Sequence, residues 1–378
     1  MTVLKPFNVP SKISIGEDCK EYEDESETES ECDSIPSEKS AIIIRTKPKR
    51  TKVTKPKPRL PTPRSRAVTM SSYINNNPMI EEKLNVIAVI SNPCFFMRRY
   101  QLFSEFMVRM NNNKTINFYV VELIYGNQYY FLTNKNNPNH LQLHVEHPLW
   151  HKENMINLAV DKLLPRDWKA FAWIDADVTF ESPTWASDTL KILNNFDIVQ
   201  LFSHCEDLDK DEMTMNIFQS FAYNYCKAKP YVNKGLDYWH SGYAWAIKRQ
   251  AYEQLGGLYH YGVLGSGDAI MALSLIGRVD KVMTHDYSEG YKHSMYEFQR
   301  KACSLKLGYV NGVIRHSYHG SKKNRKYMER GEILVKYKYD PYRMINIDSS
   351  GLLIPNHRFK HEFKKDILKY FHERNEDE

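Results

Sequence analysis

The stretch Phe171-Ala-Trp-Ile-Asp-Ala-Asp-Val178 joins an apolar run directly to two carboxylates, Asp175 and Asp177. The apolar part has the composition of a strand that is buried on both faces, so the carboxylates are expected where that strand ends. Hard cations such as Mg²⁺ and Mn²⁺ favour carboxylate oxygens, and Mg²⁺ commonly combines one or two of them with substrate phosphates. The stretch therefore predicts a metal site, and with it an enzyme that handles a nucleoside diphosphate.

An Asp-x-Asp pair is a weak signal by itself. If about 5% of residues are Asp, a chain of 378 residues holds about one such pair by chance. Asp207-Leu-Asp209 and Asp209-Lys-Asp211 also match, but they lie in the polar segment from Cys205 to Glu212, which is typical of a solvated loop or a helix start. Only the first pair follows an apolar run, so context selects it.

The composition predicts a chain with a substantial core. Hydrophobic residues make up 42% and aromatic residues 13%, and the length of 378 residues is enough for one large or two ordinary domains. The 6 cysteines form no C-x-x-C pair, which argues against a zinc cluster and favours a reducing compartment. We see neither an apolar run long enough for a transmembrane helix nor the apolar core of a signal peptide, so we predict a cytoplasmic protein.

Residues 1–80 are predicted to form a disordered tail. An acidic, Ser-rich block runs from Glu17 to Asp33, and a basic, Pro-rich block runs from Arg45 to Arg66. Such segments bury too little apolar area to offset chain entropy, and the Pro spacing favours polyproline II. A solvated tail is the simplest interpretation. The alternatives are a nuclear-localisation-like signal, or an electrostatic tether through which the basic block contacts nucleic acid or an acidic membrane. The whole chain has a net charge of +6.

Strands and helices alternate from Asn85 onward. Strands are predicted at Val86–Ile90, Asn117–Ile124, Ala170–Ile174 and Asp197–Phe202, and helices at Arg98–Met110 and Trp150–Leu164. This alternation predicts an α/β fold with a parallel, doubly wound sheet. Ligands of such sheets lie at the carboxyl ends of the strands, where Asn92, Glu122, Asp175 and Asp177 are expected.

The later part of the chain adds a second group of polar residues. Gly262, Gly265 and Gly267 surround a loop that ends in Asp268, and an apolar helix is predicted to follow. Asp268 is either the N-cap of that helix or a functional carboxylate. His316 and His319 then precede a basic stretch, which suggests a combined metal and phosphate site, although each histidine alone would more often be structural.

Together these pieces resemble a metal-dependent GT-A glycosyltransferase over roughly residues 85–330. The resemblance is carried by Val86–Ile90, by Trp150–Asn157 with Trp173–Phe180, by His240–Ile247 with Leu255–Leu258 and Gly265–Asp268, and by His316–His319. The third piece is similar to galactosyltransferase-like and polypeptide N-acetylgalactosaminyltransferase-like families. Their Trp-Gly-rich signature is replaced here by Leu-Gly-Ser-Gly-Asp, so the donor sugar does not carry over, and the membrane anchor of their Golgi forms is not seen.

The resemblance implies a Rossmann-like GT-A domain at residues 81–330, with a nucleotide-binding half and an acceptor-binding half. Residues 331–378 form an extension, in which Phe363, Ile367 and Phe371 lie on one face of a terminal helix that docks on the core or on a partner.

The resemblance also implies roles for single residues. Asp177 and His319 are metal ligands for Mn²⁺ or Mg²⁺, with His316 as the alternative to His319, and Asp175 lies near the ribose and the metal. Asp268 is the general base, which implies single displacement with inversion. The donor is a nucleotide sugar, UDP-sugar being favoured, and the acceptor is a glycan or glycoprotein.

Further residues are weaker candidates for the same site. Asn92, Glu122 and Lys152 are assigned to the nucleotide; Lys322, Lys323 and Arg325 to the leaving diphosphate; and Trp239, His240, Tyr243 and Trp245 to the acceptor or sugar. Core packing or a solvated face is the competing interpretation for each of them. The oligomeric state is open, with a homo-oligomer among the options.

Two other functions remain open at this point. One is a nucleotidyltransferase that makes nucleotide sugars, which uses a metal and a similar sheet. Such enzymes usually carry a Gly-rich basic loop after the first strand, and Ser91–Met97 contains no glycine. The other is a catalytically silent carbohydrate-binding protein, against which the intact set of Asp175, Asp177, Asp268 and His319 argues.

Overall fold

The structure is a computed structural model that describes residues 78–233, 235, 238–326 and 329–378. The predicted disordered tail therefore lies, apart from its last residues, outside the described part of the chain, as do the contacts expected of it.

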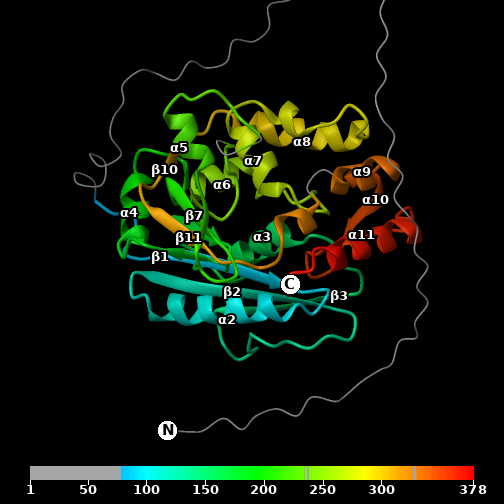
Figure 1. The fold of residues 1–378 in the computed structure, drawn as a ribbon, viewed down its shortest axis with the longest axis horizontal. Coiled ribbons are helices and arrows are strands. Elements are labelled where there is room, and N and C mark those ends of the chain that lie inside the picture. The colour runs from blue at the N-terminus through cyan, green and yellow to red at the C-terminus, as the bar shows by residue number, and fades with distance from the viewer. Residues whose placement is uncertain (1–77, 234, 236–237, 327–328) are drawn as a thin grey trace, which may run out of the picture. The chain divides into compact units, whose positions relative to one another are not determined.

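The central feature is a mixed sheet of 7 strands in the order β10-β6-β9-β4-β1-β2-β3 (Figure 1). Its strands are β1 Leu84–Ser91, β2 Ile116–Tyr125, β3 His140–Val145, β4 Ala170–Ile174, β6 Ile198–Gln200, β9 Ala244–Lys248 and β10 Leu307–Tyr309. The predicted α/β class is confirmed. β4 lies between β1 and β9, and all five of its side chains are buried, as its apolar composition predicts.

One strand runs against the predicted parallel direction. β9 pairs antiparallel with both β4 and β6, whereas the other neighbouring pairs of this sheet are parallel. Hydrophobic periodicity shows that a segment is buried but carries no information on its direction. The reversal has a consequence for function, because it brings the start of β9 to the carboxyl end of β4, where Asp175 N donates a hydrogen bond to Tyr243 O at 2.8 Å.

Helices cover both faces of the sheet and give two apolar cores. On one face, α2 Met97–Asn112 and α4 Trp185–Ile192 pack against side chains of β1 such as Val86. On the other face, α3 Lys152–Lys162, α7 Gly267–Leu275 and α8 Glu289–Ala302 enclose Ile87, the neighbour of Val86 on the strand. Adjacent strand residues thus face opposite cores, as the strand period of two requires. The short helices α5 Phe221–Cys226 and α6 Arg249–Leu255 and the 3₁₀ turn Val279–Val282 complete this side.

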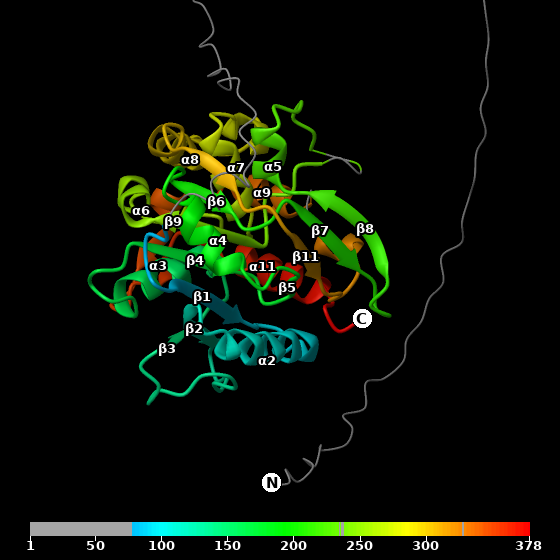
Figure 2. The ribbon, with the colours of Figure 1, turned by 90° about the vertical axis from the view of Figure 1, so that its left-hand side faces the viewer.

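A second sheet of 4 strands, in the order β5-β11-β7-β8, stands beside the first (Figure 2). It consists of β5 Val178–Phe180, β11 Val313–His316, β7 His204–Leu208 and β8 Thr214–Gln219. β5 begins directly after Asp177, and its Val178 is the register partner of His316. This small sheet therefore brings the late histidine segment to the carboxyl end of β4.

The last part of the chain packs on the same core. It contains the 3₁₀ turn Lys322–Arg325, α9 Glu329–Lys336, α10 Pro341–Met344, β12 Ile345–Ile347, β13 Leu353–Pro355 and α11 His361–Glu373. Phe363, Ile367 and Phe371 of α11 are buried in the core that also contains α3, so this helix docks on the chain itself. In the described residues, no helix combines the length and apolarity needed to cross a membrane. The boundaries at residues 80 and 330 stay predictions.

Candidate active site

Asp177 lies at the centre of a cluster that contains both predicted histidines. Its Oδ2 is 2.9 Å from Nε2 of His319 and 3.6 Å from Nε2 of His316, and these two nitrogens are 3.3 Å apart. Ser317 N donates to Asp177 O at 2.8 Å, which holds the histidine loop against the Asp-x-Asp turn. Within the described residues this is the group of three potential ligands that is close enough to hold a metal ion. The structure thus brings His316 and His319 together rather than selecting one.

The hydrogen-bond partners of the two histidines determine which ring nitrogens could bind a cation. Nδ1 of His316 donates to Asp207 Oδ1 at 2.6 Å, so in the neutral ring Nε2 presents a lone pair. Nε2 of His319 lies 2.7 Å from Arg325, which engages its lone pair in this structure, so a bound cation would replace that contact. With both rings neutral, the two Nε2 atoms and the carboxylate of Asp177 are close enough to one another to share one ion. Oδ1 of Asp177 is buried and has no hydrogen-bond partner among the described residues.

The charges in the cluster also favour a bound cation. Burial opposes a charge on His316, but Asp177 and Asp207 outweigh it, and the pKa of His316 is raised. Burial likewise opposes the ionised form of Asp177, but the two histidines hold its pKa well below the ordinary value. The cluster therefore attracts positive charge, and its nitrogen and oxygen donors are suitable ligands for a divalent metal such as Mn²⁺.

Asp207 is the residue that sequence reasoning placed wrongly. It was expected in a solvated segment, but it lies in β7 and is 1% exposed. Alternate residues of β7 are buried, and Asp207 is on the buried side, where one oxygen accepts from His316 and the other from Lys322. The alternation was hidden in the sequence because most of the side chains of β7 are polar.

A second ionic chain joins the other carboxylates. Nζ of Lys152, at the start of α3, is 2.6 Å from Asp175 Oδ1 and 3.1 Å from Asp268 Oδ2. Burial opposes the charge on Lys152, but the two carboxylates outweigh it and raise its pKa. Burial raises the pKa of Asp175 to about 6, against the effect of Lys152. Lys152 therefore links the Asp-x-Asp pair to the predicted base.

The glycine-rich loop determines where Asp268 lies. Gly265 has φ +93° and Ser266 φ +75°, so the chain turns sharply before α7 begins at Gly267. A Cβ on Gly267 would lie 2.1 Å from Oε1 of Glu153, which shows how closely α7 approaches α3. Asp268 is not the N-cap, a position that Ser266 occupies, and its carboxylate turns to Lys152 instead.

Glu153 is a second residue that sequence reasoning missed. It follows Lys152 in the first turn of α3 and is 5% exposed. Burial, and then Asp268, raise its pKa to about 8, so its surroundings favour the protonated carboxyl. The signal that was available is a glutamate directly beside the candidate lysine in the first turn of the same helix.

Three of the four residues predicted to bind the acceptor or sugar have different surroundings. His240 stacks on Tyr243 with ring centroids 4.1 Å apart, and burial lowers its pKa to about 3. A Cβ on Gly242 would lie 3.1 Å from the His240 ring and 3.8 Å from Asp268 Oδ2, so His240 and Asp268 flank this glycine. Trp239 instead packs edge-on against Phe221 in the core and is 8% exposed, which leaves little of it for an acceptor.

Two residues predicted to bind the nucleotide form hydrogen bonds with the protein backbone instead. Both oxygens of Glu122 accept backbone hydrogen bonds from the β2–β3 loop, including Phe131 N at 2.8 Å and Thr133 N at 2.8 Å. The side chain of Asn92 bonds to both backbone groups of Phe96 and closes the turn between β1 and α2. These contacts explain why both residues are buried, and they shape the loops at the sheet edge.

No known protein-family profile matches the chain, and no curated protein matches it in sequence. Among solved structures, a mannosyltransferase from Pyrobaculum calidifontis in complex with GDP-Man and Mn²⁺ is 13% identical, with a TM-score of 0.36 over 81% of this chain and 79% of that one. A Drosophila beta-1,4-galactosyltransferase 7 in complex with manganese, UDP-Gal and xylobiose is 9% identical, with a TM-score of 0.33 over 72% and 94%.

A nucleotidyltransferase is similar to the same degree. The inositol-1-phosphate CTP transferase of T. maritima is 12% identical, with a TM-score of 0.33 over 68% of this chain and 97% of that one. At such identities and TM-scores, the three structures carry no argument about what this chain does.

Proposed function

We propose that this chain is a metal-dependent glycosyltransferase of the GT-A type. It transfers a sugar from a nucleotide diphosphate, UDP being the nucleotide we favour, to a hydroxyl of a glycan or glycoprotein. The observation that supports this most is the position of Lys152, which lies 2.6 Å from Asp175 and 3.1 Å from Asp268. A predicted metal-binding motif and a predicted base that are 93 residues apart in sequence (268 − 175) thus meet at one site.

The metal end of the site has the groups needed for a diphosphate leaving group. Asp177, His316 and His319 would hold the cation, which when bound supplies Lewis-acid neutralisation of the phosphate charge. Two cations lie beside these ligands: Lys322 pairs with Asp207, and Arg325 contacts His319. In the proposed reaction they add positive charge where the diphosphate leaves.

The acceptor end has a carboxylate that solvent can reach. The side chain of Asp268 is 24% exposed, so an acceptor hydroxyl can approach it. As the hydroxyl oxygen bonds to the anomeric carbon, the bond from that carbon to the diphosphate oxygen breaks, and the hydroxyl proton passes to Asp268. Attack from the face opposite the leaving group inverts the anomeric configuration. Lys152 holds Asp268 in place, and His240 with Tyr243 forms the wall beside it.

A donor screen tests this proposal. The protein with Mn²⁺ is heated with UDP-, GDP- and CDP-sugars in turn, and separately with nucleoside triphosphates plus sugar phosphates. We expect a rise in melting temperature with one nucleotide-sugar class, absent when Mn²⁺ is removed, followed by slow hydrolysis of that donor. Pyrophosphate release from a triphosphate would instead identify a nucleotidyltransferase, and no response to any nucleotide would contradict the proposal.

A base test distinguishes catalysis from binding. Asp268→Asn should leave donor affinity within about twofold and lower transfer about 100-fold or more, as is typical of a lost general base. Asp211→Asn is the matched control, because Asp211 is an exposed aspartate of another Asp-x-Asp pair. Unchanged transfer by Asp268→Asn would place the base elsewhere.

A further inference from the structure

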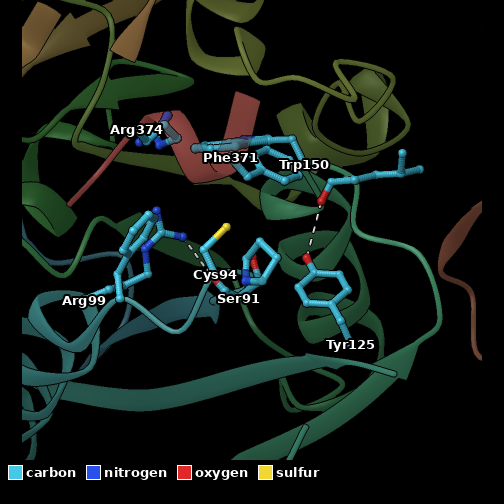
Figure 3. A pocket seen from close by; sticks show the side chains of 10 residues that line it. Ser91, Cys94, Arg99, Tyr125, Trp150, Phe371 and Arg374 are labelled. Carbon is cyan, nitrogen blue, oxygen red and sulfur yellow. Dashed lines mark hydrogen bonds between the residues drawn. The ribbon is translucent and has the colours of Figure 1, made fainter. Parts of the chain in front are cut away.

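Residues 374–378, which we call the latch segment, lie across the carboxyl ends of β1 and β2. Figure 3 shows Arg374, Phe371 and Trp150 along one side of the pocket, with Arg99 and Cys94 on the opposite side. The guanidinium of Arg374 is 5.2 Å from the centre of the Trp150 ring. The edge of a parallel sheet where strands end is the usual ligand position of such folds, so the latch segment covers the place where a nucleotide would be expected.

The latch segment is fixed mainly by one buried carboxylate. Glu376 is 2% exposed and pairs with Arg99 through both oxygens, with Nε of Arg99 at 2.8 Å from Oε2. Nε of Arg374 is 2.8 Å from Oε1 of the same residue. On its other side, Oε2 of Glu376 is 3.8 Å from Nδ1 of His319. A negative group thus lies between an arginine of α2 and a histidine of the metal cluster.

Two further contacts hold the segment without any charge partner. The carboxylate of Asp377 accepts from the backbone N–H groups of Met97 and Arg98 at 3.0 and 2.7 Å, at the start of α2. The backbone at Asn375 passes so close to Gly320 that a Cβ there would lie 2.6 Å from Asn375 O. Gly320 follows His319 directly, so the segment touches both the nucleotide side and the metal side.

The space left beneath the segment is too small for a nucleotide. The cavity has a volume of about 10 Å³, room for about one water molecule. It is lined by Ser91, Cys94, Tyr125, Trp150, Phe371 and Arg374, among others. Arg99 closes one side by donating to Ser91 O at 2.7 Å. A nucleotide can enter here only if the latch segment moves.

We propose that Arg99 is a binding residue for the diphosphate of the donor and that Glu376 competes for it from within the chain. This inference rests on the proposed function. A diphosphate offers Arg99 the same paired oxygens as a carboxylate, with more charge. Since Glu376 also lies beside His319, a diphosphate that reaches Arg99 can extend toward the metal cluster. Donor binding and release of the latch segment are therefore linked. A bound donor favours the state in which the latch segment is released and disfavours the closed state shown here.

The test compares Glu376→Gln with the wild type. This variant keeps the shape of the side chain and removes its charge, so Arg99 becomes available. With Mn²⁺ present, we expect calorimetry to show binding of UDP and of inorganic pyrophosphate that is about tenfold tighter than in the wild type. Glu373→Gln is the matched control, because Glu373 lies at the end of α11 and pairs with Lys326 instead; its affinities should equal those of the wild type.

A second variant and a second readout cover a loss of folding in Glu376→Gln. Asp377→Asn weakens the latch segment without leaving buried arginines unpaired, and it should tighten binding in the same direction. In the wild type, hydrogen exchange at the amides of Met97 and Arg98 should become faster when UDP binds, because Asp377 leaves them. Equal UDP affinity in wild type and both variants, with slower exchange at these amides, would overturn the inference and leave the proposed function standing. Tighter pyrophosphate binding with no response to any nucleotide would keep the anion site and contradict the proposed function.

Discussion

Asp207 determines which nitrogen His316 presents to Asp177. It accepts from Nδ1 at 2.6 Å, is 1% exposed and also binds Lys322. Carboxylates behind a metal-binding histidine fix its tautomer and orientation and increase its basicity. The structure therefore extends the candidate metal site beyond the ligands that the sequence suggested.

We expect Asp207→Asn to lower the affinity for Mn²⁺ by about 10- to 100-fold, the usual effect of removing such a partner. Isothermal titration of Mn²⁺ into the purified protein checks this. Asp211→Asn serves as the control, because Asp211 is exposed in the turn between β7 and β8. Equal Mn²⁺ affinity in the two variants would show that Asp207 does not support the site.

Burial of His260 makes the stability of the protein sensitive to acid. Burial lowers its pKa to about 4, whereas in the unfolded chain it titrates near 6.5. Between these values the unfolded state binds more protons than the folded state. The contribution of His260 to the free energy of unfolding is therefore fully present above about pH 6.5 and is lost as the pH drops toward 4. The loss amounts to about 3 kcal/mol across this window.

His260→Gln should therefore flatten the decline of unfolding free energy between pH 6.5 and 4. Urea unfolding at several pH values measures it. The hydrogen bond from Asn157 to His260 is lost or altered equally at every pH, so it shifts the curve without changing its slope. Parallel curves for the variant and the wild type would refute the assignment.

At the scale of elements, the packing of α7 against α3 positions Asp268. Gly267 is the contact point, since a Cβ there would lie 2.1 Å from Glu153 Oε1 and 2.9 Å from Glu153 Cγ. Gly267→Ala should displace Glu153 and shift Asp268, with a loss of about 1–3 kcal/mol of unfolding free energy, typical of overpacking. Transfer activity should fall with it.

Chemical denaturation of Gly267→Ala measures the loss of unfolding free energy. The double variant Glu153→Ala, Gly267→Ala should recover part of that loss. Gly312→Ala is the control, because a Cβ there meets nothing within 4 Å. A Gly267→Ala protein as stable and active as Gly312→Ala would contradict close packing at this contact.

The sequence predicted elements well where they are long and buried on both faces. The strand expected at Asn117–Ile124 is β2 Ile116–Tyr125, and the helix expected at Arg98–Met110 is α2 Met97–Asn112. The edge strand β3 was missed, although its sequence alternates polar and apolar residues as a half-buried strand does. The direction of β9 and the pairing of β7 with β11 depend on contacts between distant segments, which no local pattern records.

The same limit applies to the site. Local context selected four of the site residues, namely Asp177, His319, Lys152 and Asp268. The structure brings the first two together in one ionic cluster and the last two in another. The roles of Glu122 and Asn92 as loop anchors could not be predicted, because their partners are backbone groups.

At the scale of the whole molecule, α11 joins the end of the chain to the core beneath the site. Phe363 is 1% exposed and stacks on Phe359 with ring centroids 4.2 Å apart. Phe363→Ala should cost about 3–5 kcal/mol of unfolding free energy. Leu368→Ala on the same helix is the control, because Leu368 is 37% exposed.

Thermal unfolding of both variants measures the difference. We expect one cooperative transition at lower temperature for Phe363→Ala, since residues 331–378 share a core with α3. A separate early transition, with the rest of the protein unchanged, would instead show that these residues form an independent unit.

The central claim is that a nucleotide diphosphate binds through a metal held by Asp177 and the two histidines. Calorimetric titration of UDP into the wild type and into Asp177→Asn, each with and without Mn²⁺, tests it most directly. We predict UDP binding by the wild type only when Mn²⁺ is present, and a loss of at least about 100-fold in Asp177→Asn, more than 2.7 kcal/mol. UDP binding of equal strength without Mn²⁺ or with Asp177→Asn would contradict the account.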